Sequence, residues 1–266
     1  MQFEGPLRKM MTEFSEPIQY FMELRGQFLQ VNQLLDKTIE ISFKGYECLS
    51  CGQGAPIFRQ GFCKSCFFEV PQAADWIIHP EQSKAHLGIE DRDLAYEQKM
   101  QLQPHVVYLA NSSNVKVGVT RKAQIPTRWI DQGAHEALPL LEVPNRYLAG
   151  IAEVALKGHV SDKTNWRTML KNEIEDVDLW QWKERLIQFL PNEVAAYLSQ
   201  EHKTSVCFPV IAYPIKPKSL NLSKTPFYTG KLKGIKGQYL IFEDDTVFNV
   251  RSNEGIVVGL NVLTEV

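Results

Sequence analysis

The stretch that decides the fold of this chain lies in its middle, between Val106 and Glu153. It begins as Val106-Val107-Tyr108-Leu109-Ala110, passes through Asn111-Ser112-Ser113-Asn114, and continues as Val115-Lys116-Val117-Gly118-Val119-Thr120. Two apolar runs rich in β-branched residues, joined by a short turn of Asn and Ser, are typical of a β-hairpin. We therefore expect an antiparallel pair of strands at the centre of the chain.

Two helices are expected after this hairpin. The first contains Arg128 and Trp129, and the second covers Asn145 to Leu156. The apolar positions of the second segment recur at helical spacing, and on that phase Glu153 lies beside the apolar face. The central stretch thus predicts a hairpin followed by two helices.

This order of motifs resembles the GIY-YIG endonuclease superfamily, in which a hairpin carries a Tyr on its first strand and a Lys/Tyr-Ile-Gly-like run on its second. Here Tyr108 stands in the first motif and Lys116-Val117-Gly118 in the second. The Arg of the following helix corresponds to Arg128, and the metal-binding Glu of the next helix to Glu153. The first motif lacks its Gly, and Val117 stands where many members place a second Tyr. A Lys-Ile-Gly form found in some branches is closer to this sequence.

The resemblance implies roles for four catalytic candidates. Glu153 would hold a Mg²⁺ or Mn²⁺ ion that polarises the scissile phosphate, and Arg128 would stabilise charge on that phosphate. Tyr108 would position or deprotonate the attacking water, with Lys116 as an electrostatic helper. Structural roles stay open beside these: Tyr108 as a half-buried core aromatic, and Arg128 as the salt-bridge partner of Glu153 or Asp131.

The strongest single motif precedes the hairpin and consists of two Cys-x-x-Cys pairs, Cys48 with Cys51 and Cys63 with Cys66. This spacing is typical of a four-cysteine zinc ribbon, whose closed tetrahedron of thiolates is structural. A ribbon that also touches nucleic acid is the alternative, with Arg59, Lys64 and Phe67-Phe68 as its surface. Cys207 lies far from these pairs and is expected to be a buried small hydrophobe.

Composition limits the class of protein without selecting a function. The 266 residues are 44% hydrophobic and 23% charged, with a formal net charge of −2, so no overall basic character indicates nucleic acid. The stretch from Val106 to Leu170 is nevertheless mildly basic, which favours a polyanion there. No run is long and apolar enough to span a membrane, and the N-terminus lacks the features of a signal peptide. We therefore expect a cytoplasmic protein with reduced or metal-bound cysteines.

The fold class expected from these patterns is α+β, with a small GIY-YIG-like α/β domain, a zinc ribbon and β-rich terminal segments. Phe3-Glu4-Gly5-Pro6-Leu7 faintly echoes Tyr228-Thr229-Gly230-Lys231-Leu232, so the two ends are expected to pair into one barrel or sandwich. Extended structure is expected at Asp75–Glu81 and at Val206–Pro214, the latter as an edge strand. The predicted segments are an N-terminal β segment (1–45), the ribbon (46–70), a connector (71–104), the GIY-YIG-like domain (105–200) and a C-terminal β segment (201–266).

Three functions remain open from the sequence. The first is a nucleic-acid-binding protein, DNA or RNA, with a divalent-metal-dependent phosphodiesterase site. The second is a nucleic-acid-binding module that kept the fold without the chemistry. The third is a scaffold whose ribbon and barrel bind protein partners. Convergence of Tyr108, Arg128 and Glu153 on one solvent-reached patch would favour the first.

Overall fold

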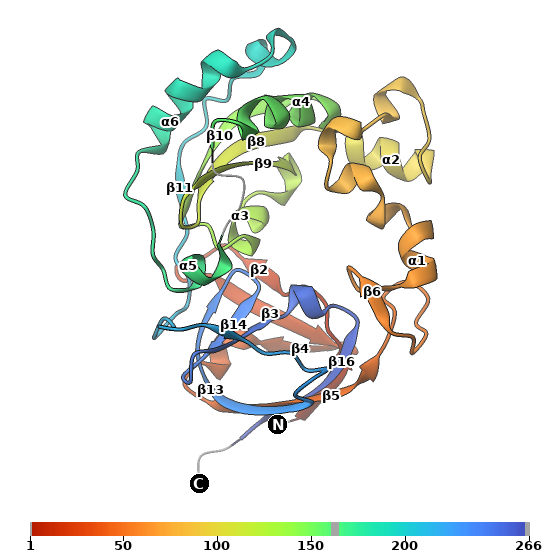
Figure 1. Cartoon of the computed structure of the whole chain (residues 1–266), viewed down its shortest axis with the longest axis vertical. Helices are drawn as coiled ribbons and strands as arrows, with labels where there is room; N and C mark the ends of the chain where they lie inside the picture. Colours follow the sequence, from red (N-terminus) through yellow and green to blue (C-terminus); the bar gives the residue numbers. More distant parts are fainter. Residues whose placement is uncertain (1, 161–164, 264–266) are drawn as a thin grey trace. The chain divides into compact units, whose positions relative to one another are not determined.

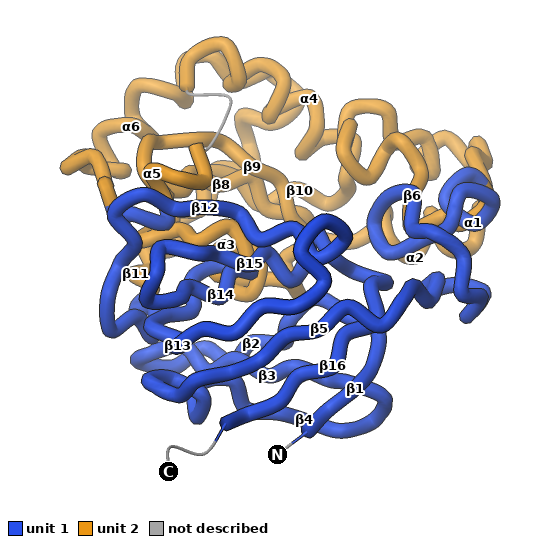
Figure 2. The backbone as a smooth tube through the Cα atoms, turned by 60° about the horizontal axis from the view of Figure 1, so that its bottom comes forward, with its two compact units in different colours: residues 1–68, 170–172, 207–266 blue, residues 69–169, 173–206 orange. Residues whose placement is uncertain are grey.

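The computed structural model describes residues 2–160 and 165–263. The chain divides into two compact units, coloured separately in Figure 2. Unit 1 contains residues 1–68, 170–172 and 207–266, and unit 2 contains residues 69–169 and 173–206. Unit 1 therefore takes in most of the predicted terminal segments and the ribbon, and unit 2 most of the connector and central domain. The fold is α+β, as expected, with several separate sheets.

Unit 1 is built mainly from strands. Its elements are β1 (Gln2–Pro6), β2 (Met11–Glu13), β3 (Gln19–Leu24), β4 (Gln27–Gln30), η1 (Val31–Leu34), β5 (Thr38–Tyr46), β6 (Ile57–Arg59), β7 (Phe62–Cys63), α1 (Lys64–Glu69), β12 (Lys218–Ser219), β13 (Phe227–Lys236), β14 (Tyr239–Phe242), β15 (Thr246–Asn249), η9 (Arg251–Asn253) and β16 (Ile256–Val262).

The two ends of the chain lie in one seven-stranded sheet of order β1-β16-β5-β13-β14-β15-β12. Phe3 pairs with Leu260 across β1 and β16, so the expected pairing of the terminal segments is confirmed. Of the two expected forms, a barrel or a sandwich, the closed barrel is not formed, because within the described residues the sheet stays open, with β1 and β12 at its edges. A second sheet, β2-β3-β4, buries every other residue of β3, namely Tyr20, Met22 and Leu24.

Unit 2 combines one sheet with helices. Its elements are η2 (Pro71–Ala73), η3 (Asp75–Ile77), η4 (Pro80–Gln82), η5 (Ala85–Leu87), α2 (Leu94–Gln101), β8 (His105–Asn111), β9 (Val115–Arg121), η6 (Lys122–Gln124), α3 (Thr127–Asp131), β10 (Glu136–Val143), α4 (Arg146–Lys157), α5 (Trp166–Leu170), α6 (Leu179–Leu186), η7 (Ile187–Phe189), η8 (Asn192–Tyr197) and β11 (Thr204–Ser205). None of the helices in the described ranges has both the length and the apolar character to cross a bilayer.

The sheet of unit 2 has the order β11-β10-β8-β9 and helices on both faces. Successive residues of a strand point to opposite faces, so β8 contributes to two cores. Val107 and Leu109 pack with residues of α4 and α6, and we call this the α4 face. Tyr108 packs with Trp129 of α3 on the other side, the α3 face. The predicted hairpin and both predicted helices are thus present, and Figure 1 shows α4 beside β8 and β9.

Two predicted strands are absent, and each for a local reason. Asp75–Glu81 forms the 3₁₀ turns η3 and η4, because Pro80 at the first turn of η4 starts a helix as readily as it ends one. Val206–Pro214 contributes only an isolated bridge from Val210 to Gly234, since its prolines lack the N–H groups of a ladder. Cys207 in this segment is exposed, so its expected burial is also wrong.

Helix α4 approaches η4 through Gly150. A Cβ atom at this position would lie 2.2 Å from the backbone nitrogen of Glu81 and 2.4 Å from the carbonyl carbon of Pro80. Both are backbone atoms, so a larger residue would push the two elements apart. Gly158, just past the end of α4, has no such neighbour within 4 Å.

We expect Gly150→Ala to lower the free energy of unfolding by about 3 kcal/mol, the upper part of the range for an overpacked core. Gly158→Ala is the matched control and should change it by less than about 0.5 kcal/mol. Urea unfolding of both variants followed by far-UV circular dichroism checks this. Equal stability of the two variants would show that α4 and η4 do not pack this closely.

Candidate functional site

The four predicted metal-binding cysteines form one cluster in unit 1. Cys63 ends β7 and Cys66 lies in α1, while Cys48 and Cys51 come from the turn after β5. Their four sulfur atoms all lie within 4.8 Å of one another, and those of Cys51 and Cys63 are 3.9 Å apart. Thiolates bound at about 2.3 Å around a tetrahedral ion are separated by roughly 3.8 Å. The cluster therefore fits a structural metal ion such as zinc.

The backbone around Cys48 is arranged to favour its thiolate. Its sulfur accepts a hydrogen bond from the backbone N–H of Cys63 at 3.3 Å. Burial alone would raise the pKa of Cys48, but the backbone N–H groups of Cys51, Cys63 and Ser50 outweigh burial and lower this pKa to about 6. Gly61, with φ of +79°, makes the turn between β6 and β7 and accepts a hydrogen bond from Leu49. A thiolate at neutral pH is the form that binds a metal.

Tyr108 occupies a closed position on the α3 face of unit 2. It pairs with Gly118 across β8 and β9, and a Cβ on Gly118 would lie 2.8 Å from the Tyr108 ring carbon Cζ. Gly118 therefore makes room for the ring. The Tyr108 side chain has no solvent exposure, and its hydroxyl bonds to the Gln132 side chain at 3.1 Å. Burial raises the pKa of Tyr108, against the opposing charge of Arg128.

Gln132 connects this tyrosine to Arg128. With its amide oriented so that both ends are satisfied, its oxygen accepts from Nε and Nη2 of Arg128, each at 3.3 Å. The two residues are four apart at the end of α3, so their side chains share one side of the helix. Tyr108 thus helps to hold the guanidinium of Arg128 in place.

Lys116 lies within electrostatic range of Arg128, and we call these two residues the cation pair. Lys116 belongs to the face of β9 that also carries Gly118, and therefore to the α3 face. Burial and, to a smaller extent, the like charge of Arg128 together lower the pKa of Lys116 to about 8. The structure thus gathers three predicted catalytic residues, Tyr108, Lys116 and Arg128, on one face.

Glu153 comes from α4, on the other face of the sheet, and belongs to a second charged group. Its carboxylate lies 3.7 Å from the ammonium of Lys157, one turn later. Burial raises the pKa of Glu153, while the charges of Lys157 and Arg146 oppose that rise. The Glu153 charge also acts weakly on Tyr108, which places the two groups within electrostatic range of each other.

Arg146 interacts electrostatically with both Glu153 and Arg128, and the sequence did not single it out as a site residue. Its guanidinium donates to the carbonyl oxygens of Trp76 and Ile77, at 3.0 and 2.6 Å. Burial lowers the pKa of Arg146 to about 10; the charge of Glu153 raises it, and that of Arg128 lowers it. Arg146 therefore lies within electrostatic range of both Glu153 and Arg128. The carbonyl groups that Arg146 contacts lie about 70 positions earlier in the sequence, so no local sequence pattern could have revealed its role.

The histidines of the connector have ordinary roles. Nδ1 of His79 lies 3.4 Å from a carboxylate oxygen of Glu81, and the ring of His86 stacks on the ring of Tyr147 with their centroids 4.6 Å apart. His105 is buried, and its Nδ1 lies 2.7 Å from the carbonyl oxygen of Gln103. Burial lowers the pKa of His105 to about 4, so this ring is neutral at physiological pH.

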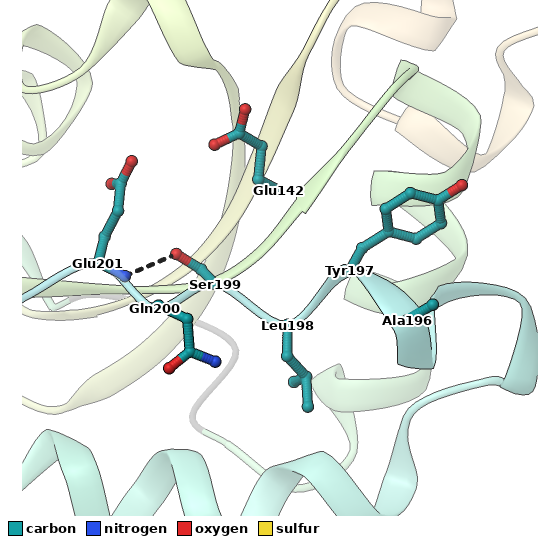
Figure 3. A pocket seen from close by; sticks show the side chains of 7 residues that line it. All are labelled: Glu142, Ala196, Tyr197, Leu198, Ser199, Gln200 and Glu201. Atoms are coloured by element: carbon teal, nitrogen blue, oxygen red, sulfur yellow. Dashed lines mark hydrogen bonds between the residues drawn. The ribbon is translucent and has the colours of Figure 1, made fainter.

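Unit 2 also has a surface pocket that contains none of the predicted site residues. Figure 3 shows its lining, which is Glu142, Ala196, Tyr197, Leu198, Ser199, Gln200 and Glu201. The ammonium of Lys122 lies 2.7 Å from Glu142 and 3.9 Å from Glu201, so it forms ion pairs with both acids of the pocket. The pocket carries none of the site residues that the sequence singled out, and the cation pair is therefore the stronger candidate.

The fold combines a ribbon whose four cysteines fit a metal ion with a mixed α/β unit that carries a half-buried cation pair, and these two features define its class of protein. A family model described as "Protein of unknown function (DUF2797)" matches residues 36–258, so the chain belongs to this family. Neither the search of curated proteins nor the search of solved structures found a match.

Proposed function

We propose that this protein binds nucleic acid and that unit 2 engages a phosphate group at the cation pair. The observation that supports this most is that Lys116 lies on the same face as Arg128 and within electrostatic range of it. Burial and like charge both disfavour a protonated Lys116, as its pKa of about 8 reflects. An anion between the two cations would relieve this repulsion, and the planar fork of an arginine suits phosphate oxygens.

Nucleic acid is the polyanion that the surroundings favour. The central stretch is mildly basic within a chain of net charge −2, and such asymmetry localises a polyanion. The order of Tyr108, Lys116, Arg128 and Glu153 resembles the GIY-YIG superfamily, whose members act on nucleic acid. The order of the helices and strands that carry these residues is compatible with that resemblance. Labelled DNA and RNA, each single-stranded and duplex, are the ligands to test.

Binding should weaken as pH rises, because the ligand needs a protonated Lys116. Between about pH 7 and about pH 9 we expect the affinity for a labelled oligonucleotide to fall roughly tenfold. Arg128 stays charged in this range, and the raised pKa of Tyr108 keeps that hydroxyl neutral. Lys116→Arg keeps the positive charge and should bind with little change over the same range. Fluorescence anisotropy measures both, and an identical pH profile in the two proteins would exclude Lys116 from the binding site.

Metal-dependent hydrolysis of the phosphodiester is the second candidate function. Glu153 is the residue that supports it, because it is a half-buried carboxylate within electrostatic range of Tyr108, and carboxylates are the ligands that Mg²⁺ and Mn²⁺ take. Such a cation would polarise the phosphate bound at the cation pair. Tyr108 then acts as a positioning residue, since its shielded hydroxyl holds Arg128 through Gln132 and does not reach water.

Cleavage of labelled DNA and RNA with Mg²⁺ or Mn²⁺ tests this second function. We expect Glu153→Gln to lose at least about a hundredfold in rate, as other charge-stabilising groups do when removed. Glu142→Gln, which removes a carboxylate at the pocket of Figure 3, should cleave like the wild type. Cleavage that survives in Glu153→Gln would refute its role. Binding without any cleavage would support a protein that binds nucleic acid and does not cut it.

The metal of the cysteine cluster is, in this proposal, Zn²⁺ with a structural role. Four thiolates complete a tetrahedron and leave no position for water or substrate. Cysteines bind zinc only in the reduced state, and the cytoplasm keeps thiols reduced, so this role agrees with a cytoplasmic location.

A further inference from the structure

Three aromatic rings gather on the ribbon of unit 1, and we call Phe58, Phe67 and Phe68 the ribbon aromatic cluster. The ring centroids lie 5.2 Å apart for Phe58 and Phe67, 5.8 Å for Phe58 and Phe68, and 5.3 Å for Phe67 and Phe68. Although the rings contact one another, Phe58 is 43% exposed and Phe68 is 58% exposed. Large apolar side chains grouped on a surface mark a binding site more often than single ones do.

The three rings come from two short elements of the ribbon. Phe58 lies in β6, where its neighbours Ile57 and Arg59 pair with Cys63 and Phe62 of β7. Phe67 and Phe68 directly follow the predicted metal ligand Cys66 in α1. Rings that already pack against one another lose less conformational entropy on binding than isolated ones, which favours them as a stacking platform.

Two basic residues flank the cluster. The guanidinium carbon of Arg59 lies 5.4 Å from the centroid of the Phe58 ring, and Lys64 is exposed at the start of α1. From Cys48 to the end of α1 the sequence has these two basic residues and one acidic residue, Glu69, so the basic residues outnumber the acidic one. Aromatic faces flanked by cations match a ligand that alternates flat rings with phosphates, namely unpaired nucleic acid.

We infer that the ribbon aromatic cluster stacks on unpaired bases of single-stranded nucleic acid, with Arg59 and Lys64 facing its phosphates. Bases of a duplex are already stacked on one another, so this surface selects single strands. The inference goes beyond the phosphate contact proposed for unit 2. It concerns a different surface, so the two can succeed or fail separately.

The double variant Phe58→Ala/Phe68→Ala tests this surface in the full, metal-loaded chain. The probe is a 5′-labelled 20-nucleotide single strand, compared with the same sequence as a duplex, and affinity is read by fluorescence anisotropy. Stacking of one base commonly contributes about fivefold to a hundredfold to affinity. We therefore expect the single strand to bind at least about tenfold more weakly and the duplex to change less than about twofold. Metal content of the variant confirms that the ribbon is intact.

Two further variants make the result specific. Phe28→Ala removes an apolar ring that is 67% exposed on β4 of the same unit, and it should bind both probes like the wild type. Phe58→Trp/Phe68→Trp keeps aromatic faces and should retain single-strand binding. The inference is overturned if the alanine variant binds single strands like Phe28→Ala. It is equally overturned if the alanine variant loses duplex and single strand alike, or if the tryptophan variant binds as weakly as the alanine variant. Lys116→Ala/Arg128→Ala, by contrast, should weaken both probes.

Discussion

Cys48→Ser is expected to release the metal of the ribbon and to unfold the segment from Cys48 to Cys66. Each thiolate closes one position of the tetrahedron, and structural zinc in small ribbons and fingers contributes on the order of 10 kcal/mol to folding. The purified wild-type chain should contain about one metal ion, and the variant close to none. Metal analysis of both proteins, with limited proteolysis of residues 48–66, measures the effect.

Cys207→Ser is the matched control, because Cys207 is exposed and lies outside the four-cysteine cluster. It should keep the metal and resist the protease like the wild type. A Cys48→Ser protein with full metal content would contradict the assignment of the ligands. Loss of metal from Cys207→Ser would mean that the ligand set is a different one.

Lys116→Ala/Arg128→Ala is expected to weaken nucleic-acid binding on the order of a hundredfold. Hydrogen bonds to charged groups contribute about 1.5–3 kcal/mol each, and the variant removes two such groups from one phosphate site. Lys84→Ala/Lys99→Ala removes the same charge from exposed positions of unit 2 and should cost far less. Anisotropy titrations compare the three proteins, after circular dichroism has shown that each is folded. Equal losses in the two variants would mean that only net charge matters.

The parts of the fold that the sequence revealed are those with a strong local signal. The hairpin of β8 and β9 follows from two β-branched runs around an Asn- and Ser-rich turn. Strand β10 was missed, because Pro139 interrupts its pattern and its pairing with β8 shifts register between Pro139 and Leu141. Strands β1 and β16 pair although nearly the whole sequence separates them. Only the faint echo between residues 3–7 and 228–232 pointed toward this pairing.

The candidate site divides in the same way. The cysteine cluster was predictable because the spacing of each Cys-x-x-Cys pair carries its geometry. Tyr108, Lys116 and Arg128 were proposed from motif order, and the structure does bring them together. The closed position of the Tyr108 hydroxyl could not be predicted, since it depends on Gln132 and on the room that Gly118 leaves. Arg146 owes its place to carbonyl groups of the distant turn η3, a contact set by tertiary structure alone.

The salt dependence of binding tests the central proposal, a phosphate held by Lys116 and Arg128, most directly. The logarithm of affinity falls linearly with the logarithm of salt concentration, by about 0.7 for each phosphate contact to a single strand. Because both residues contact the same phosphate in this proposal, we expect Lys116→Ala/Arg128→Ala to reduce the magnitude of this slope by about 0.7 relative to the wild type, with Lys84→Ala/Lys99→Ala close to the wild type. An unchanged slope in Lys116→Ala/Arg128→Ala would show that the cation pair contacts no phosphate, and would contradict the proposal.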